Sequence, residues 1–262
     1  MSKIKIAIIG AGNVASHFVE KIKNTDIQIL QICNRHINKA KKLANIVNAE
    51  AIDNFEQILP NADIYFFMLS DSGIVEIIDK IKSQKGIFVH TSGTLSKDIF
   101  KNHTNNYGVF YPFQTFSEKD KLNFNDLPIL LDTSNKYTSE ILEKFAQNLK
   151  CKVYNIDEKQ RQIIHLSGIF ASNFANHCVF LGEQILKNEN IDIDIIQPLL
   201  KQSFNKIFSI GAKKAQTGPA YRNDEIIIEK HLKMLENNRN LSEIYKILSK
   251  SIQKTYNIET NE

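Results

Sequence analysis

Apolar and polar positions follow two different rhythms along this chain of 262 residues, and the change falls near residue 157. Before that point, apolar runs of strand length alternate with segments of helical periodicity, an order typical of βαβ units. After it, apolar residues recur only at helical spacing. The pattern predicts an α/β fold, with a doubly wound parallel sheet over residues 1–156 and a smaller all-helical domain over residues 157–262.

The same pattern places the individual elements. Strands are expected at 4–9, 27–33, 62–69, 86–90, 107–111, 128–131 and 151–156, with a short one at 51–52. Helices of the first part are expected at 38–47, 54–59, 74–81 and 139–149, and an amphipathic segment opens at residue 14. Helices of the second part are expected at 159–186, 195–214, 224–235 and 241–253.

The first strand runs directly into a short glycine motif, which consists of Gly10, Ala11, Gly12, Asn13, Val14 and Ala15. A strand, a tight turn and a helix start in this order can wrap around a pyrophosphate. Gly10 permits the turn, Gly12 lets the backbone approach the phosphates, and Ala15 keeps the helix close to the strand. The motif therefore predicts a Rossmann dinucleotide site, although small residues chosen only for packing would give the same pattern.

The end of the second strand indicates which dinucleotide binds. An NAD site usually carries an acidic residue there to bind the ribose hydroxyls, whereas this strand ends in Asn34 and Arg35. A guanidinium would pair with a 2′-phosphate. We therefore expect NADP(H), unless Arg35 belongs only to a solvated face. Asn34 would either bind a 2′-substituent or cap the helix that follows.

Composition narrows the class of protein. The net charge of +4 is small and evenly spread, which disfavours nucleic acid as a partner, and no apolar run approaches the 18 residues of a membrane span. Three cysteines without a CxxC pair favour the cytoplasm. Cys33 and Cys178 lie in apolar segments, so we expect both to be buried. The sequence has no metal-ligand spacing, and no metal is expected.

Three polar loops follow predicted strands, and ligands of an open parallel sheet bind at the carboxyl ends of its strands. We expect cofactor contacts from the first two loops, with Ser92 near the nicotinamide as a catalytic residue and Tyr111 lining the substrate pocket. The predicted cofactor ligands in these loops are Ser70, Asp71, His90 and Thr91. Helix capping by Ser70 or Asp71 and an ordinary turn around Ser92 remain open alternatives.

The helical half carries one polar stripe inside an apolar helix, formed by His165, Ser172, Asn173, Asn176 and His177. At 3.6 residues per turn, His165, Ser172 and Asn176 would lie nearly in line. We expect His165 to donate a proton to the substrate and Asn173 or Asn176 to orient it. Arg222, which follows a Gly-Pro break, would bind an anionic group. A core or interface histidine is the alternative for His165.

These motifs together resemble a family of bacterial Rossmann-like NADP oxidoreductases with an all-helical C-terminal domain. The resemblance covers nearly the whole chain and rests on five stretches of residues, 10–18, 89–94, 108–116, 165–177 and 215–224. The family is similar in layout to pyrroline-5-carboxylate reductase, ketopantoate reductase and the β-hydroxyacid dehydrogenases. That kinship implies a homodimer joined through the helical domain and a substrate cleft between the domains.

The chain departs from these relatives at one position. The β-hydroxyacid dehydrogenases carry a catalytic lysine early in the corresponding long helix. The helix of this chain offers His165 instead, with Lys159 and Arg161 one turn or more earlier. We therefore expect an NADPH-dependent reductase of a small ketone, keto acid or imine, with His165, Asn173 and Ser92 as catalytic residues. The alternative is an NADP(H)-binding regulator that catalyses nothing.

Overall fold

The computed structural model describes residues 3–81, 85–118 and 122–256. The chain divides into two compact units, which we name the sheet unit (Met1–Ile169) and the helical unit (Phe170–Glu262) and describe separately. The boundary lies one helix later than the expected one after residue 156. The intervening helix α5 (Glu158–Gly168) belongs with the sheet unit, because it contacts that unit through several buried or half-buried side chains.

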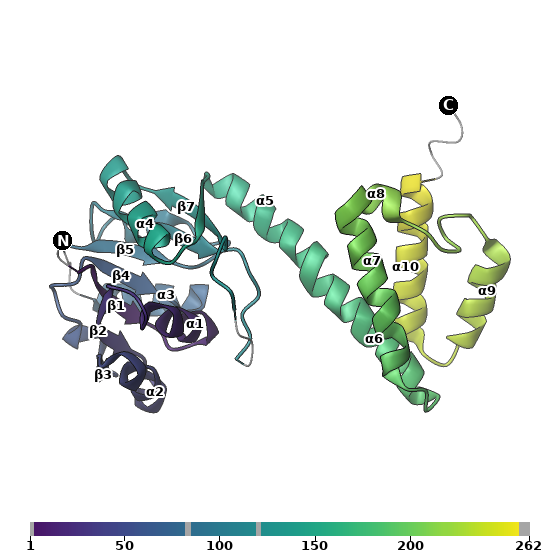
Figure 1. Ribbon diagram of the computed structural model, residues 1–262, viewed down its shortest axis with the longest axis horizontal. Coiled ribbons are helices and arrows are strands. Elements are labelled where there is room, and N and C mark those ends of the chain that lie inside the picture. Colours follow the sequence, from purple (N-terminus) through teal and green to yellow (C-terminus); the bar gives the residue numbers. More distant parts are fainter. Residues whose placement is uncertain (1–2, 82–84, 119–121, 257–262) are drawn as a thin grey trace. The chain divides into compact units, whose positions relative to one another are not determined.

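The sheet unit is built on one sheet of eight strands in the order β3-β2-β1-β4-β5-β6-β7-β8 (Figure 1). The strands are β1 (Lys5–Ile9), β2 (Gln28–Cys33), β3 (Glu50–Ile52), β4 (Ile64–Phe67), β5 (Ile87–His90), β6 (Tyr107–Pro112), β7 (Pro128–Thr133) and β8 (Lys152–Asn155). The chain order reverses between β1 and β4, which is the point where doubly wound sheets bind their ligands.

The sequence pattern predicted a sheet that is parallel throughout, and this prediction is wrong at one pair of strands. β6 and β7 pair antiparallel, with Phe110 opposite Leu131, whereas β7 and β8 again pair parallel. Two neighbouring parallel strands need a crossover, usually a helix. The described residues between β6 and β7 contain no helix, so β7 returns alongside β6 in the opposite direction. Helix α4 (Lys136–Asn148) supplies the crossover from β7 to β8.

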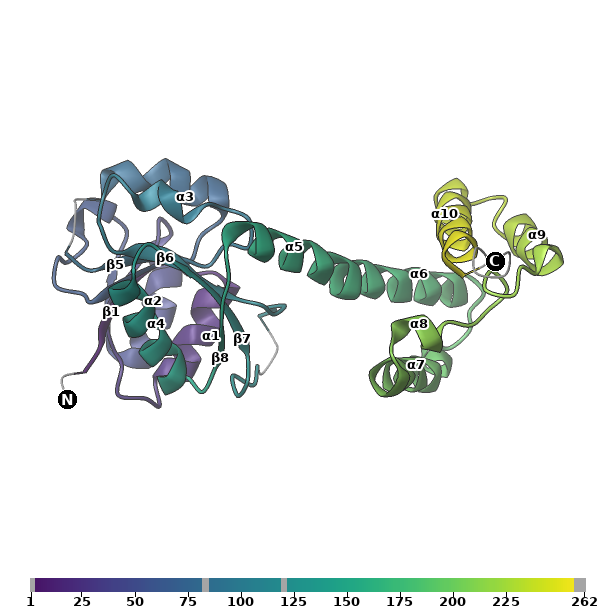
Figure 2. The ribbon, with the colours of Figure 1, turned by 90° about the horizontal axis from the view of Figure 1, so that it is seen from above.

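Helices cover both faces of the sheet (Figure 2). α1 (Asn13–Ile22), α2 (Ile37–Val47) and α4 pack on one face, over a core that includes Phe18, Phe66 and Phe110. α3 (Asp71–Ile77) packs on the other face, over a core that includes Phe67 and Phe88. Alternate residues of one strand serve the two cores, because side chains of a strand point to opposite faces. The doubly wound fold is therefore confirmed.

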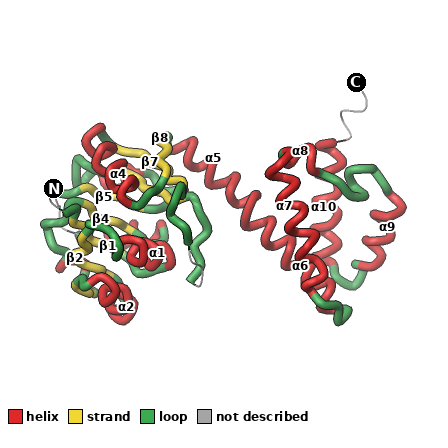
Figure 3. Tube along the Cα trace, in the orientation of Figure 1, coloured by secondary structure: helices red, strands yellow, loops and turns green. Residues whose placement is uncertain are grey.

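The helical unit contains only helices and turns over residues 170–256 (Figure 3). A π-helical segment, Ile169–Phe174, leads into α6 (Ala175–Asn188), α7 (Gln197–Ile210), α8 (Ala212–Ala215), α9 (Glu225–Met234) and α10 (Arg239–Tyr256). Cys33 is buried, as expected. The same expectation is wrong for Cys178, which is exposed like most of α6, a helix without any buried residue. In the described part of the chain, no helix is long and apolar enough to cross a membrane.

Candidate active site

The turn between β1 and α1 has the shape of a phosphate cradle. Gly10 adopts φ +119°, and a Cβ there would lie 2.2 Å from the carbonyl oxygen of Met68, so the position requires glycine. At Gly12, no described atom lies within 4 Å of where a Cβ would stand, and no side chain caps α1. Open space beside an uncapped helix start fits an anionic group, because the first N–H groups point outward.

Two side chains in the first turns of α1 form hydrogen bonds with the segment that follows β6. Asn13 donates from Nδ2 to the carbonyl oxygen of Phe116 at 3.1 Å, and Nε2 of His17 lies 2.8 Å from the carbonyl oxygen of Ser117. The segment after β6 therefore lies against the start of α1. Nδ2 of Asn13 is thus engaged with this segment, and the cofactor contacts predicted for exposed Asn13 and half-buried Val14 stay predictions. Ala15 is fully buried, as its packing role requires.

The end of β2 presents one cation to solvent. Arg35 is exposed, while Asn34 is buried and its Oδ1 accepts a hydrogen bond from the backbone N–H of His36 at 3.2 Å. This bond shapes the turn into α2, so the Asn34 oxygen acts in the local turn.

Burial, with a smaller contribution from the carboxylate of Asp53, raises the pKa of the Cys33 thiol to about 12. Cys33 is therefore a protonated core residue.

The two predicted cofactor residues at the start of α3, Ser70 and Asp71, have local partners. Ser70 caps α3, since its Oγ accepts from the N–H of Gly73 at 3.2 Å. Asp71 accepts a hydrogen bond from the hydroxyl of Thr94 at 2.7 Å. The capping alternative therefore describes Ser70. Asp71 links the start of α3 to the loop that follows β5.

The loop after β5 is held by its own polar groups. His90 is fully buried: its Nδ1 accepts from the N–H of Ser92 at 3.2 Å, and its Nε2 lies 3.3 Å from the carbonyl oxygen of Ser96. Burial lowers the pKa of His90 to about 4, so the imidazole is neutral at pH 7. Its ring has no face left for a cofactor. The expected contact of this side chain therefore finds no support, whereas half-buried Thr91 stays a prediction.

Ser92 shapes the same loop through its hydroxyl. The oxygen accepts hydrogen bonds from the N–H groups of Thr94 at 3.0 Å and Leu95 at 2.9 Å. Its side chain is buried, with an exposed fraction of 9%. The proton of Ser92 faces Oγ1 of Thr94 at 3.4 Å, because Thr94 donates its own hydroxyl proton to Asp71. The catalytic role predicted for Ser92 remains a prediction, and the structure gives the residue a clear role in fixing the turn.

Two predicted site residues meet above this loop. The hydroxyl of Tyr111, near the end of β6, lies 3.0 Å from Nδ1 of His165 on α5. Gly93 makes the approach possible, because a Cβ there would lie 2.6 Å from His165 Nδ1 and 3.1 Å from Tyr111 Cζ. β5 and β6 are parallel, so Gly93 and Tyr111 stand at the same edge of the sheet. Both aromatic rings are half-buried.

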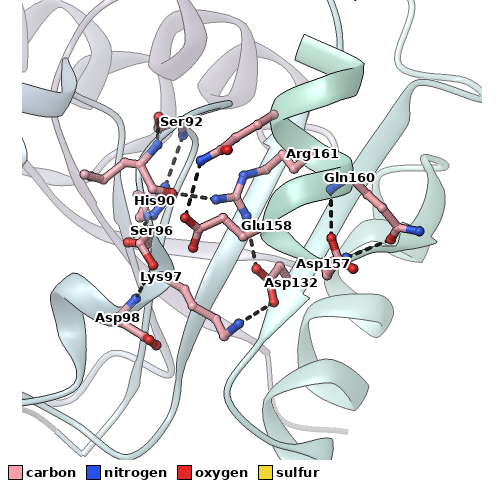
Figure 4. A network of polar contacts seen from close by, with 12 residues as sticks. His90, Ser92, Ser96, Lys97, Asp98, Asp132, Asp157, Glu158, Gln160 and Arg161 are labelled. Atoms are coloured by element: carbon pink, nitrogen blue, oxygen red, sulfur yellow. Dashed lines mark hydrogen bonds and ion pairs between the residues drawn. The ribbon is translucent and has the colours of Figure 1, made fainter. Parts of the chain in front are cut away.

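A buried cation that the sequence reasoning missed fixes α5 over this edge (Figure 4). Arg161 is fully buried; its Nη1 lies 3.2 Å from Oδ2 of Asp132 on β7, and its Nη2 donates to the carbonyl oxygen of Leu95 at 2.6 Å. Asp132 also pairs with Lys97, whose Nζ lies 2.7 Å from Oδ1. An arginine in the first turn of a helix normally lies in solvent. The one sequence signal for Arg161 is its spacing of four residues from His165, which places both side chains on the same face of the helix.

The remaining predicted residues lie in the helical unit. Asn173 falls within the π-helical segment, Asn176 lies in the first turn of α6, and Arg222 follows the Gly218 turn; all three are exposed. The alignment expected from 3.6 residues per turn is wrong beyond Gly168, because a π-helix has a wider turn. The polar stripe is thus not one straight row along an α-helix, and the roles of these three residues stay predictions.

The arrangement supports proton transfer and anion binding. The described residues contain no group of three or more His, Cys, Asp and Glu side chains that could hold a metal ion. The Tyr111–His165 pair offers a hydroxyl and an imidazole at the carboxyl edge of the sheet, which is the edge that also carries the phosphate cradle. Together these features suit a reaction in which a bound dinucleotide and a proton-donating pair act on one substrate.

Comparison with known families matches the two halves of the chain separately. Residues 1–89 match a family described as shikimate / quinate 5-dehydrogenase, and residues 127–252 match a domain of unknown function, DUF2520. No match was found among curated proteins.

Comparison with solved structures matches nearly the whole chain. A "putative NADP oxidoreductase" from Bacteroides fragilis is 33% identical, with 97% of this chain and 99% of that chain covered and a TM-score of 0.90. A Thermotoga maritima protein is 22% identical, with 98% and 100% covered and a TM-score of 0.73. An imine reductase from Myxococcus stipitatus, in complex with NADP+, shares the fold at 13% identity, with 96% and 95% covered and a TM-score of 0.66.

Proposed function

The chain belongs to the family of Rossmann-fold NADP oxidoreductases represented by the Bacteroides fragilis protein, and from this premise we propose that it is an NADP(H)-dependent reductase. Its substrate is a small ketone, keto acid or imine, which receives a hydride. One observation carries the proposal: the open cradle at Gly12 and the Tyr111–His165 pair both stand at the carboxyl edge of one sheet.

The glycine turn and Arg35 would hold the cofactor. The pyrophosphate would lie beside Gly12, where the uncapped helix start offers N–H donors. The exposed guanidinium of Arg35 would pair with the 2′-phosphate that distinguishes NADP from NAD. The NADP+ complex of the imine reductase supports this choice of cofactor, since that protein shares the fold. When bound, the cofactor supplies the hydride.

The chain's own residues would handle the proton and the substrate. His165 would supply the proton that the substrate oxygen or nitrogen gains as hydride arrives. The loop from Thr91 to Thr94 would lie near the nicotinamide, with Ser92 fixing its shape. Asn173, Asn176 and Arg222 would bind and orient the substrate, as the sequence predicts. Excluding water from the site would protect the hydride step.

The test is consumption of NADPH by the purified protein with a panel of small ketones, keto acids and cyclic imines. We expect turnover of at least one class, and we expect His165→Ala to lower kcat by about 100-fold or more with little change in NADPH affinity. An unchanged rate would remove His165 from the mechanism. NADPH binding without any turnover would favour the regulator described above.

We also propose that the chain forms a homodimer through the helical unit. This unit leaves large apolar side chains in water, including Phe170 at 65%, Phe208 at 82% and Ile226 at 79% exposed. Soluble monomers rarely expose large apolar patches. Light scattering should give a molar mass in solution of twice the chain mass. Phe208→Asp should lower that mass toward the mass of a single chain. Tyr137→Asp, on an exposed tyrosine of the sheet unit, is the matched control and should leave the mass unchanged.

A further inference from the structure

One face of α5 packs against the loops that carry the chemistry. Arg161, His165 and Gly168 are spaced i, i+4 and i+7, so they lie on the same face of the helix. Arg161 bonds the carbonyl oxygen of Leu95, His165 meets Gly93, and a Cβ on Gly168 would lie 2.7 Å from the ring of Phe113. The position of the His165 ring is therefore fixed from both sides along the helix.

The Nδ1 edge of that ring is covered. Gly93 lies directly against Nδ1 and Cγ, and the hydroxyl of Tyr111 lies 3.0 Å from Nδ1. The two rings meet edge to face, with centroids 5.9 Å apart. A substrate atom has no room to reach Nδ1 itself. A proton on Nδ1 can leave toward a substrate only through the oxygen of Tyr111, because a hydroxyl can accept one hydrogen bond while donating another.

Resting on the reductase proposed above, we propose that Tyr111 is a further catalytic residue, whose phenol passes the proton to the substrate while His165 restores it. The sequence placed Tyr111 only as a wall of the substrate pocket. In this assignment His165 acts through Tyr111 and is the positioning and relay residue. Arg161, buried one turn earlier, holds α5 so that the two rings stay in contact.

The step balances in atoms and electrons. The hydride, which the reduced nicotinamide would supply and in doing so be oxidised, forms a new C–H bond at the substrate carbon, and the π electron pair of C=O or C=N moves to the heteroatom. The heteroatom takes the proton of the Tyr111 hydroxyl. The Tyr111 oxygen takes the proton from Nδ1 of the His165 imidazolium, which becomes neutral. Before the next turnover, a hydronium ion of the solvent gives a proton to the Tyr111 oxygen, which passes its own proton back to Nδ1 of His165.

The environment of Tyr111 suits a neutral donor. Burial raises the pKa of Tyr111, so the phenol stays protonated at neutral pH. Three ionisable groups of α5 and the neighbouring loops are paired or neutral. Asp71 accepts from Thr94, Arg161 pairs with Asp132, and His90 is neutral and buried.

The first arm of the test needs no substrate. Tyrosines of the full-length protein are labelled with ¹³C at Cζ, and the Tyr111 resonance is assigned with Tyr111→Phe. We expect this resonance to shift as His165 gains its proton, and we expect His165→Gln to remove that shift. A Tyr111 chemical shift that does not change when His165 gains its proton would overturn the proposal, whatever the protein catalyses.

The second arm uses a ketone, keto acid or imine that the panel shows to be reduced. Tyr111→Phe keeps the ring, so we expect kcat to fall by about 100-fold or more with KM within about threefold. Tyr107→Phe is the matched control on the same strand, because its hydroxyl bonds Asp98 at 3.3 Å instead. It should keep the wild-type kcat. A Tyr111→Phe enzyme with normal kcat, beside an inactive His165→Ala enzyme, would show direct donation by His165 and overturn the proposal.

The two arms separate the relay from the function on which it rests. Failure of the ¹³C arm in a protein that reduces panel compounds rejects the relay and leaves the reductase standing. A protein that binds NADPH but turns over no panel compound rejects the reductase and the proton step with it, even when the rings prove to be coupled.

Discussion

Arg161 and Asp132 form an ion pair in which the guanidinium is fully buried and the carboxylate is 7% exposed, with Nη1 and Oδ2 3.2 Å apart. The pair joins α5 to β7, a strand that runs antiparallel to β6. Nη2 of the same arginine bonds the carbonyl oxygen of Leu95, in the loop after β5. Three elements that meet at the carboxyl edge are thus fixed by one side chain.

Breaking this pair from one side should destabilise the sheet unit strongly. Asp132→Asn leaves a buried guanidinium without its counter-ion, which costs about 3–5 kcal/mol. Urea unfolding should show the loss as a lower midpoint. Glu140→Gln is the control, since Glu140 pairs with Lys136 at 3.8 Å with both side chains largely exposed, and it should change stability by about 0.5 kcal/mol or less. Equal effects of the two changes would contradict a structural role for the buried pair.

The two glycines of the cradle should respond differently to alanine. Gly10→Ala forces a Cβ onto the carbonyl oxygen of Met68 at φ +119°, so we expect a loss of about 3 kcal/mol or more in the free energy of unfolding. Gly12→Ala meets no described atom, so its stability should stay within about 1 kcal/mol of wild type. Its methyl group would instead occupy the space of the phosphates, and NADPH titration should show weaker binding. Normal NADPH affinity in Gly12→Ala would place the pyrophosphate elsewhere.

Arg35 should decide between the two nicotinamide cofactors. Removing a charged hydrogen-bond partner of a phosphate costs about 1.5–3 kcal/mol. Arg35→Ala should therefore weaken NADPH binding by about 10- to 100-fold and leave NADH binding unchanged. Fluorescence titration of both cofactors measures this, with Lys101→Ala as an exposed-cation control. Equal weakening of NADPH and NADH would assign Arg35 a general role, and binding of neither cofactor to the wild type would remove the reductase itself.

His90 should make stability depend on pH. Burial lowers its pKa from 6.5 to about 4, so the folded chain keeps it neutral where the unfolded chain would protonate it. The contribution to stability is therefore full above pH 6.5 and falls as the pH drops toward 4. Its full size is about 3 kcal/mol. Unfolding free energies between these two pH values should fall less steeply for His90→Gln than for the wild type. Parallel pH curves would contradict a neutral buried His90.

Much of the sheet unit could be predicted because it depends on local patterns. The apolar run before Gly10 forms β1, and α1 begins at Asn13, directly after the glycine turn. Each later strand of the sheet unit overlaps its predicted range. β4 and β5 are buried along their whole length, and such strands form nearly continuous apolar runs. Even the His165 ring, chosen only for its chemistry, stands beside Tyr111.

Features that depend on distant pairing could not be predicted. The sequence placed β6 and β7 as strands, but their antiparallel pairing follows from a connection without a helix. A charged residue in the first turn of a helix is expected in solvent, but Arg161 is buried because it pairs with Asp132, which lies 29 positions earlier in the chain. The π-helical segment at Ile169–Phe174 moved the predicted polar stripe out of register. No local pattern announces that segment.

The sequence by itself thus determined the order of elements, the nucleotide motif and the residue types available for chemistry, because strand and helix periods and glycine turns are local properties. Tertiary structure alone decided which of those residues meet. It buried His90 inside its loop and brought His165 to Tyr111 through the missing side chain of Gly93. Such contacts depend on how α5 packs against the strand ends, and packing is settled by the shapes of side chains far apart in the chain.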